Sequence, residues 1–211
     1  RIVNCKPLNN NMISRIIFAF VTIYTTSCCA KLTYRGAVGT YEPRQENSAA
    51  AFEKNTKAVI QQIKEAAAQG AQIIIFPEVA LNANGLTPID CSWKTLVASR
   101  GEAIPVISNS SSEYEIPCGD SNWDQRPITQ MISCAARTYG IYVLVHLYGA
   151  QPCTKEAIGD LCPPGGVMSM SMNVVLNSKG ALVARYFKRS IALEAPGITQ
   201  PTPELLAAYP D

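Results

Sequence analysis

Two charged side chains, Glu78 and Lys188, each follow an apolar segment and could do chemistry there. Glu78 comes directly after the run Ile73–Phe76 and Pro77. Proline has no N–H group for a sheet ladder, so the strand should end before the glutamate. A carboxylate at the carboxyl end of a buried strand is a candidate general base, because open α/β sheets place their sites there. Lys188 directly follows the segment 181–187, where it could direct an ammonium group into a site.

Taken alone, these residues also fit ordinary structural positions. Most glutamates are exposed, so Glu78 is also explained as a carboxylate that faces solvent at a strand end. Lys188 is followed by Arg189, and this pair fits a solvated basic surface. His146 is the only histidine and lies in an apolar segment, which favours a neutral, hydrogen-bonded core or strand-end residue over a catalytic one. The local sequence therefore leaves the roles of Glu78 and Lys188 open.

A helix and a strand must position the glutamate. Apolar residues recur at helical spacing on one face of the segment 48–69, and Gly70 stands where a C-terminal capping glycine belongs. The segment 73–78 follows at once, and its apolar run without polar alternation predicts a strand buried on both faces. With a first strand expected within 32–38, these segments form a β-α-β unit.

The same order of helix, glycine and apolar strand then recurs. The spacing of apolar residues predicts a second helix that starts at Asp124, has Pro127 in its first turn and ends at Gly140. An apolar strand is expected over 141–148. The segment 167–187 has turn residues at its centre and predicts a β-hairpin whose return arm leads to the lysine. The chain is therefore expected to adopt an α/β fold.

Composition bounds the class of protein. The chain has 211 residues, of which 47% are hydrophobic and 16% charged, with a net charge of +2. This length supports one sizeable core, and one domain is the default expectation. The charge provides no extended basic surface, which disfavours nucleic-acid binding. A single histidine and the absence of a CxxC pair give little support to a zinc site. No metal and no cofactor are expected.

The segment 12–30 has the three parts of a secretory signal peptide: a basic start, a short apolar run and small residues before a cleavage site after Ala30. The apolar run is too short for a comfortable membrane span. A buried helix or strand is the alternative explanation of the same run. Residues 1–11 would precede the initiating Met12 as leader sequence. We therefore expect a secreted protein whose domain occupies residues 31–211.

Cysteine usage agrees with secretion. Of the eight cysteines, five lie in the expected mature segment, where an oxidising compartment would pair most of them. Cys153 and Cys162 are the predicted pair, because prolines at 152, 163 and 164 stiffen both sides of the short loop between them. Asn109 begins a glycosylation sequon in a serine-rich loop. The pairing of the other three is left open: Cys91, Cys118 and Cys134.

Taken together, these segments resemble the nitrilase, or carbon–nitrogen hydrolase, superfamily, and within it the secreted branch of pantetheinases (vanins) and biotinidases. The resemblance runs in register from about Tyr34 to Tyr209. Each piece is short, and the specificity comes from their order and spacing. In order, the pieces are 69–78, 116–118, 133–135 with 139–143, 152–153, 162–164, 173–175 and 179–188.

The resemblance implies a four-layer α-β-β-α sandwich of the nitrilase type and hydrolysis of a non-peptide amide by a Glu-Lys-Cys triad. In this chemistry a thiolate attacks the amide carbonyl, a carboxylate takes the thiol proton, and an ammonium stabilises the oxyanion. By position, the resemblance implies that Glu78 is the base and Lys188 the oxyanion stabiliser. Glu194 matches a second glutamate that helps to position these groups.

The resemblance also implies what lies beyond this sequence. The nucleophilic cysteine is expected shortly after Tyr209, so residues 31–211 would be the N-terminal part of a fold incomplete at its C-terminus and inactive alone. A C-terminal glycolipid anchor and a homodimer are compatible with the family.

The substrate implied by the resemblance is a small-molecule amide, foremost pantetheine, which yields pantothenate and cysteamine. A biotin amide is the alternative substrate, and an inactive secreted homologue that acts as a binding glycoprotein is the alternative class. Residues 79–85 differ from vertebrate members, which leaves the substrate open. An intracellular nitrilase-type enzyme is disfavoured by the leader and the cysteines.

Overall fold

The structure is a computed structural model that describes residues 33–40, 49–78, 80–81, 114–191 and 198–208. The chain divides into two units, Arg1–Thr33 and Tyr34–Asp211, and every element below belongs to the second. Within the described ranges, no helix is both long and apolar enough to cross a bilayer. Several sequence predictions lie outside these ranges: the leader 1–11, the signal peptide 12–30, Cys91, Asn109 and Glu194.

Helices and strands follow one another along the chain largely as the sequence predicts. Both predicted long helices and both arms of the predicted hairpin are present. In order, the elements are β1 (Gly36–Val38), α2 (Ala49–Ala68), β2 (Ile73–Ile75), η1 (Ser121–Trp123), α4 (Pro127–Tyr139), β3 (Tyr142–Pro152), α5 (Lys155–Ile158), η2 (Gly159–Leu161), β4 (Val167–Leu176), β5 (Leu182–Phe187) and α6 (Pro203–Ala208).

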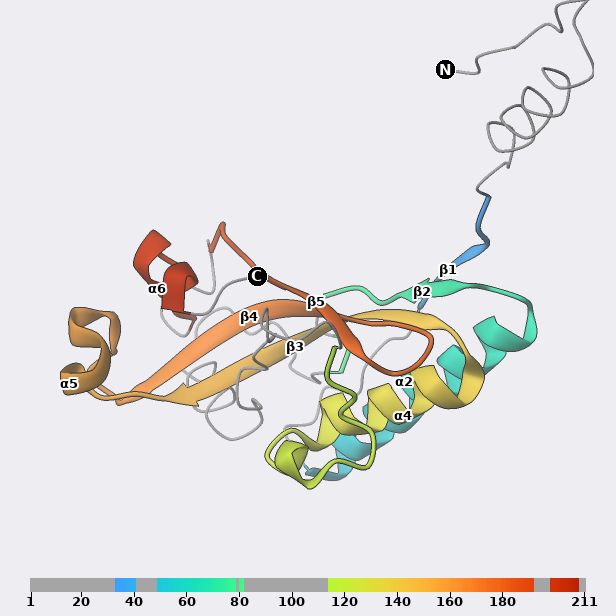
Figure 1. Cartoon of the computed structure of the whole chain (residues 1–211), viewed down its shortest axis with the longest axis horizontal. Helices are drawn as coiled ribbons and strands as arrows, with labels where there is room; N and C mark the ends of the chain where they lie inside the picture. The colour runs from blue at the N-terminus through green and yellow to red at the C-terminus, as the bar shows by residue number, and fades with distance from the viewer. Residues whose placement is uncertain (1–32, 41–48, 79, 82–113, 192–197, 209–211) are drawn as a thin grey trace, which may run out of the picture. The chain divides into compact units, whose positions relative to one another are not determined.

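The five strands form one mixed sheet in the order β1-β2-β3-β4-β5, which confirms the α/β class (Figure 1). β1, β2 and β3 are parallel, whereas β3, β4 and β5 pair antiparallel. Because two successive antiparallel pairings restore the direction, β5 runs the same way as β2 and β3. The carboxyl ends of β2 and β5 therefore point to the same edge of the sheet.

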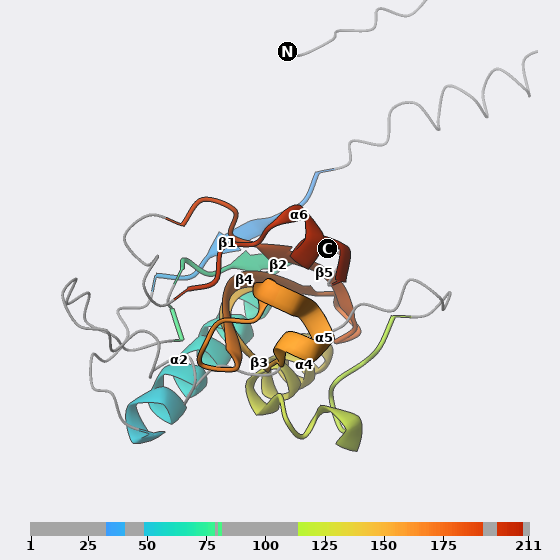
Figure 2. The same cartoon turned by 90° about the vertical axis from the view of Figure 1, so that its left-hand side faces the viewer.

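Helices α2 and α4 lie side by side on one face of this sheet (Figures 1 and 2). Crossovers between parallel strands share one hand, so the two helices are expected on the same face. The core lies between them and the sheet, where Ile63, Ile132, Ile74 and Val145 are at most 2% exposed. Of the predicted four-layer sandwich, the described residues thus contain one sheet and the helix layer that covers it.

The prediction that the strand at 73–78 is buried on both faces is wrong for its last residue. β2 ends at Ile75, and this side chain is 41% exposed, whereas Ile74 is 2% exposed. The reason is that α2 and α4 cover the face that carries Ile74, and the described residues leave the other face partly open at Ile75.

Helix α4 begins at Pro127 and is not capped by Asp124 as predicted. Asp124 instead ends η1, and Arg126 occupies the N-cap without a capping hydrogen bond from its side chain. Proline explains this start, since its fixed φ and missing N–H suit the first helical position. The predicted end is confirmed, because Gly140 has the left-handed conformation with φ of 65°.

The hairpin of β4 and β5 is confirmed, and its turn packs on α4. Asn177 Oδ1 accepts hydrogen bonds from the backbone N–H groups of Lys179 and Ala181, at 2.9 and 3.0 Å. Ser133 Oγ on α4 donates to the carbonyl oxygen of Gly180 at 2.6 Å. A Cβ atom at Gly180 would lie 2.6 Å from the carbonyl oxygen of Ser133, so only glycine fits this approach. The turn thus fixes where the return arm begins.

Two disulfides join described residues. Cys153 is bonded to Cys162, the pair predicted from the sequence, and their Cα atoms are 5.7 Å apart. Cys118 is bonded to Cys134, a pairing that the sequence left open, and this bridge ties the segment before η1 to α4. The Cα separations of the two bridges, 4.8 and 5.7 Å, lie within the usual range for protein disulfides.

Substitution of Gly180 by alanine tests the packing of the turn on α4. Gly119 is the matched control, because φ is +82° there and +81° at Gly180, but a Cβ at Gly119 meets no atom within 4 Å. Gly119→Ala should lower the free energy of unfolding by about 1 kcal/mol for the left-handed backbone. Gly180→Ala should cost about 1–3 kcal/mol more, because the added methyl group overlaps a backbone oxygen. Urea unfolding of both variants measures the difference, and equal losses would contradict the packing.

Candidate active site

The structure brings Glu78 and Lys188 into direct contact. Lys188 Nζ donates a hydrogen bond to Glu78 Oε1 at 2.8 Å, across 110 residues of sequence. Glu78 follows β2, Lys188 follows β5, and both strands end at the same edge of the sheet. The side chains are 44% and 33% exposed, respectively. The pair is therefore partly shielded and still accessible to a small molecule.

His146 on β3 and Ser171 on β4 lie beside this pair. Register places His146 opposite Asn173, so Ser171, two residues along, is a diagonal neighbour on the same face. His146 Nε2 is 2.9 Å from Ser171 Oγ and 3.9 Å from Glu78 Oε1. The backbone N–H of Lys188 donates to the carbonyl oxygen of Ser171 at 2.9 Å. Each of the four residues thus contacts two of the others.

A hollow of about 360 Å³ opens beside these four residues. This volume is in the range of small-molecule sites. Apolar side chains form part of its wall, and the polar groups converge from four strands or strand ends. The lining residues are Ile75, Phe76, Glu78, Leu144, His146, Ser171, Met172, Asn173, Tyr186 and Lys188.

Burial keeps His146 neutral. The residue is 2% exposed, and this desolvation, with a smaller contribution from the Lys188 ammonium, lowers the pKa of His146 to about 4 from 6.5. The Glu78 carboxylate acts in the opposite direction and raises that pKa, but by less than burial lowers it. Near neutral pH the imidazole beside the Glu78–Lys188 contact is therefore uncharged.

The arrangement suits acid–base chemistry with stabilisation of an oxyanion. Glu78 can take a proton, and the Lys188 ammonium lies where it can stabilise a nearby negative charge. A Ser-His-Glu relay is excluded by geometry, because Ser171 and Glu78 both contact Nε2, whereas a relay uses the two opposite ring nitrogens. The four cysteines in the described ranges are all in disulfides, so none of them offers a thiol.

The sequence predicted Glu78 and Lys188 as candidates, and it predicted a buried, hydrogen-bonded His146, which the structure confirms. It did not predict that the ring lies next to the carboxylate. Ser171 was missed altogether. The signal for it is the alternation of methionine and serine in 168–172, because alternate residues of a strand share a face.

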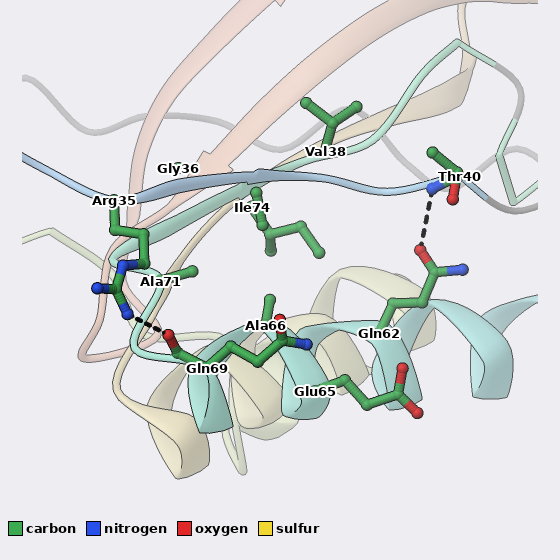
Figure 3. Close-up of a pocket in the computed structure, with 11 residues that line it drawn as sticks. Arg35, Gly36, Val38, Thr40, Gln62, Glu65, Ala66, Gln69, Ala71 and Ile74 are labelled. Carbon is green, nitrogen blue, oxygen red and sulfur yellow. Dashed lines mark hydrogen bonds between the residues drawn. The ribbon is translucent and has the colours of Figure 1, made fainter.

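A larger hollow, of about 590 Å³, lies between β1 and α2 (Figure 3). Hydrogen bonds join these elements on either side of it, from Arg35 Nη1 to the carbonyl oxygen of Gln69 and from the Thr40 N–H to Gln62 Oε1. Its floor includes Ile74, whose side chain lies on the face opposite that of Ile75. The charged residues that line this hollow form no contact like that between Glu78 and Lys188. In the part of the chain that the structure describes, no group of three or more potential metal ligands occurs.

Comparison with known proteins identifies a family. The model of the family "Carbon-nitrogen hydrolase" matches residues 37–207. A biotinidase from Takifugu rubripes is 34% identical over 156 residues, which are 74% of this chain and 29% of that protein. The pantetheine hydrolase VNN2 from Homo sapiens is 32% identical over 204 residues, 92% of this chain and 36% of the relative. The chain thus spans about a third of the length of these curated relatives.

Among solved structures, a mutant of an amidase of the nitrilase superfamily from Nesterenkonia AN1 is similar, with 15% sequence identity and a TM-score of 0.48. The match covers 82% of this chain and 50% of the amidase chain.

Acidification tests the buried, neutral state of His146. Because its pKa is about 4 in the folded protein and 6.5 in the unfolded chain, the unfolded chain binds more protons between these values. The contribution of neutral His146 to the free energy of unfolding is complete above pH 6.5 and is lost as the pH falls to 4. The loss is about 3 kcal/mol, at 1.36 kcal/mol per pKa unit. Urea unfolding from pH 7 to 4 should show a steeper loss of stability for the wild type than for His146→Gln. Parallel curves would contradict the assignment.

Proposed function

Because the chain belongs to the carbon–nitrogen hydrolase family, we propose that the protein hydrolyses a non-peptide amide and that Glu78 and Lys188 act directly in the reaction. The observation that carries this proposal is the 2.8 Å contact between Lys188 Nζ and Glu78 Oε1. A contact between charges this exposed contributes only about 0–1 kcal/mol to stability. Its place at a small-molecule hollow is therefore better explained by chemistry than by stabilisation of the fold.

In the proposed mechanism, Glu78 takes the proton of a cysteine thiol, and the thiolate attacks the amide carbonyl carbon. The Lys188 ammonium stabilises the oxyanion of the tetrahedral intermediate. The intermediate collapses with transfer of a proton from Glu78 to the leaving amine, which departs and leaves a thioester. Glu78 then takes a proton from water, and the hydroxide attacks the thioester carbon. The C–S bond breaks, the acid product leaves, and Glu78 returns its proton to the cysteine sulfur.

Two further groups complete this proposal, and both come from the family resemblance. The thiol belongs to a cysteine expected shortly beyond Tyr209, and the bonded cysteines of the described ranges do not compete for that role. Glu194, which lies outside the described ranges, is proposed to help position Glu78 and Lys188. Residues 31–211 would contribute two of the three triad members.

Pantetheine is the substrate that we propose first, with pantothenate and cysteamine as products. The match to the human pantetheine hydrolase extends over 92% of the chain, whereas the match to the Takifugu rubripes biotinidase extends over 74% at similar identity. A biotin amide is the alternative substrate. The 360 Å³ hollow accepts a small molecule and does not by itself choose between them.

We also propose that the protein is secreted. The two disulfides support an oxidising compartment. The signal peptide at 12–30 and glycosylation of Asn109 are part of this proposal, as are a homodimer and attachment to the cell surface through a glycolipid anchor, both of which rest on the family resemblance.

The role of Glu78 is tested by Glu78→Gln in the complete protein. Glutamine keeps the shape of the side chain but cannot take a proton, so kcat/KM should fall by about 10²- to 10⁴-fold. Glu115→Gln is the control, because Glu115 is exposed and its side chain lies outside the hollow. Pantetheine and a biotin amide are both assayed, and the amide with the higher kcat/KM is identified as the preferred substrate.

Two results would overturn the proposal. Normal activity of Glu78→Gln would show that Glu78 is not the general base. A folded wild-type protein that cleaves neither amide would favour the inactive binding glycoprotein.

A further inference from the structure

Glu78, Lys188, Ser171 and His146 form a closed circuit of contacts. Lys188 Nζ donates to Glu78, the Lys188 backbone N–H donates to the Ser171 carbonyl oxygen, and Ser171 Oγ is hydrogen-bonded to His146 Nε2. The circuit closes where the same Nε2 atom lies 3.9 Å from Glu78 Oε1. The proposed base is therefore flanked by an ammonium on one side and an imidazole on the other.

The imidazole is held firmly in its position. His146 and Ser171 are each 2% exposed, and both come from long paired strands. The ring of Tyr148 packs edge-on against the imidazole, with centroids 4.9 Å apart and planes at 89°. Glu78, by contrast, is 44% exposed and follows a short strand, so it has more freedom than the ring beside it. A fixed ring next to a freer carboxylate can orient that carboxylate.

The charge on Glu78 selects one tautomer of the ring. A serine hydroxyl can donate or accept, so Ser171 satisfies Nε2 whether or not this nitrogen carries the proton. A carboxylate 3.9 Å away attracts an Nε2–H group and repels an Nε2 lone pair. The ionised glutamate thus favours the tautomer with its proton on Nε2, and that N–H in turn favours the carboxylate in its present place.

We propose that His146 is a positioning residue of the amidase site: its neutral ring, held by Ser171 and Tyr148, presents an Nε2–H group that keeps the Glu78 carboxylate oriented beside Lys188. This inference rests on the proposed function of Glu78. The ring acts through the carboxylate and takes no proton from the substrate. A neutral ring suits this role, because a second cation beside Lys188 would compete for the carboxylate and oppose the proton transfer.

Nuclear magnetic resonance of labelled histidine tests the coupling without any assay of activity. His146 is the only histidine in this sequence, so its imidazole nitrogens can be assigned by comparison with the His146→Gln variant. In wild type at pH 7 the proton should reside on Nε2, and the ring should titrate well below pH 6.5. Glu78→Gln should mix the tautomers and lower the titration midpoint, because the attraction of the carboxylate is removed.

Two lysine variants provide a shift of the His146 titration midpoint in the opposite direction and a matched control. Lys188→Met should raise the titration midpoint of His146, because the ammonium opposes protonation of the ring. Lys179→Met should leave it unchanged, since Lys179 is exposed in the hairpin turn and does not line the hollow. Unchanged histidine signals in Glu78→Gln would overturn the positioning role.

Kinetics of the complete protein then separate positioning from simple packing. His146→Phe keeps a ring but has no N–H group, so kcat should fall by up to about 10²-fold, the effect of a misplaced reacting group, while KM stays close to the wild-type value. His146→Gln carries an amide N–H₂ at the position of Nε2 and should recover most of kcat. A glutamine variant as slow as the phenylalanine variant would overturn the inference.

The two proposals fail in different ways. Normal activity of Glu78→Gln would overturn the role of Glu78 as the base, whatever the histidine signals show. Loss of activity in Glu78→Gln together with unchanged tautomer and titration of His146 would overturn only the positioning role and leave the amidase proposal standing.

Discussion

The antiparallel pairing of β3 with β4 is the constraint on which the rest of the site depends. Residue pairs from Val143 with Leu176 to Pro152 with Val167 hold the two strands in one register. This register makes His146 and Ser171 diagonal neighbours on one face, and a slip of one residue would turn Ser171 to the other face. The hairpin then carries β5 back along β4, so that Lys188 hydrogen-bonds to Ser171 and reaches Glu78. Contacts between distant parts of the chain thus follow from one strand pairing.

The two faces of β4 differ in chemistry, and this difference separates core from site. Met168, Met170 and Met172 are fully buried on the face that α2 and α4 cover, where flexible apolar side chains fill the space beneath the helices. Ser169 and Ser171 are nearly as buried on the opposite face but have polar partners. The backbone N–H of Ser169 donates to Thr199 Oγ1, and its carbonyl oxygen accepts from the Thr199 N–H. The carbonyl oxygen of Ser171 accepts from the Lys188 N–H, and its hydroxyl is hydrogen-bonded to His146 Nε2. A buried hydroxyl group with a partner costs little, so this face can carry the polar Ser171 beside the site.

The titratable groups of the site differ in how deeply they are buried, and their charges follow this difference. Glu78 and Lys188 keep contact with water, which limits the cost of two charges at the rim of an apolar sheet. His146 lies deeper, where a charge would be costly, and it is neutral. An uncharged ring beside an ion pair adds no net charge to the field that the pair creates. This arrangement is consistent with proton transfer at the partly exposed Glu78 and with a rigid, buried His146 that supports it.

Local patterning by itself determined both long helices, the hairpin, the Cys153–Cys162 bridge and the two strand-end candidates, because helical spacing, turn residues and prolines act over a few residues. It did not determine the start of α4, where Pro127 rather than Asp124 decides, or the exposure of Ile75, which depends on what covers each face. Only the tertiary structure decided that Glu78 meets Lys188 and that His146 and Ser171 adjoin them. The physical reason is that strand order and register, which no local periodicity encodes, determine which distant side chains share an edge and a face.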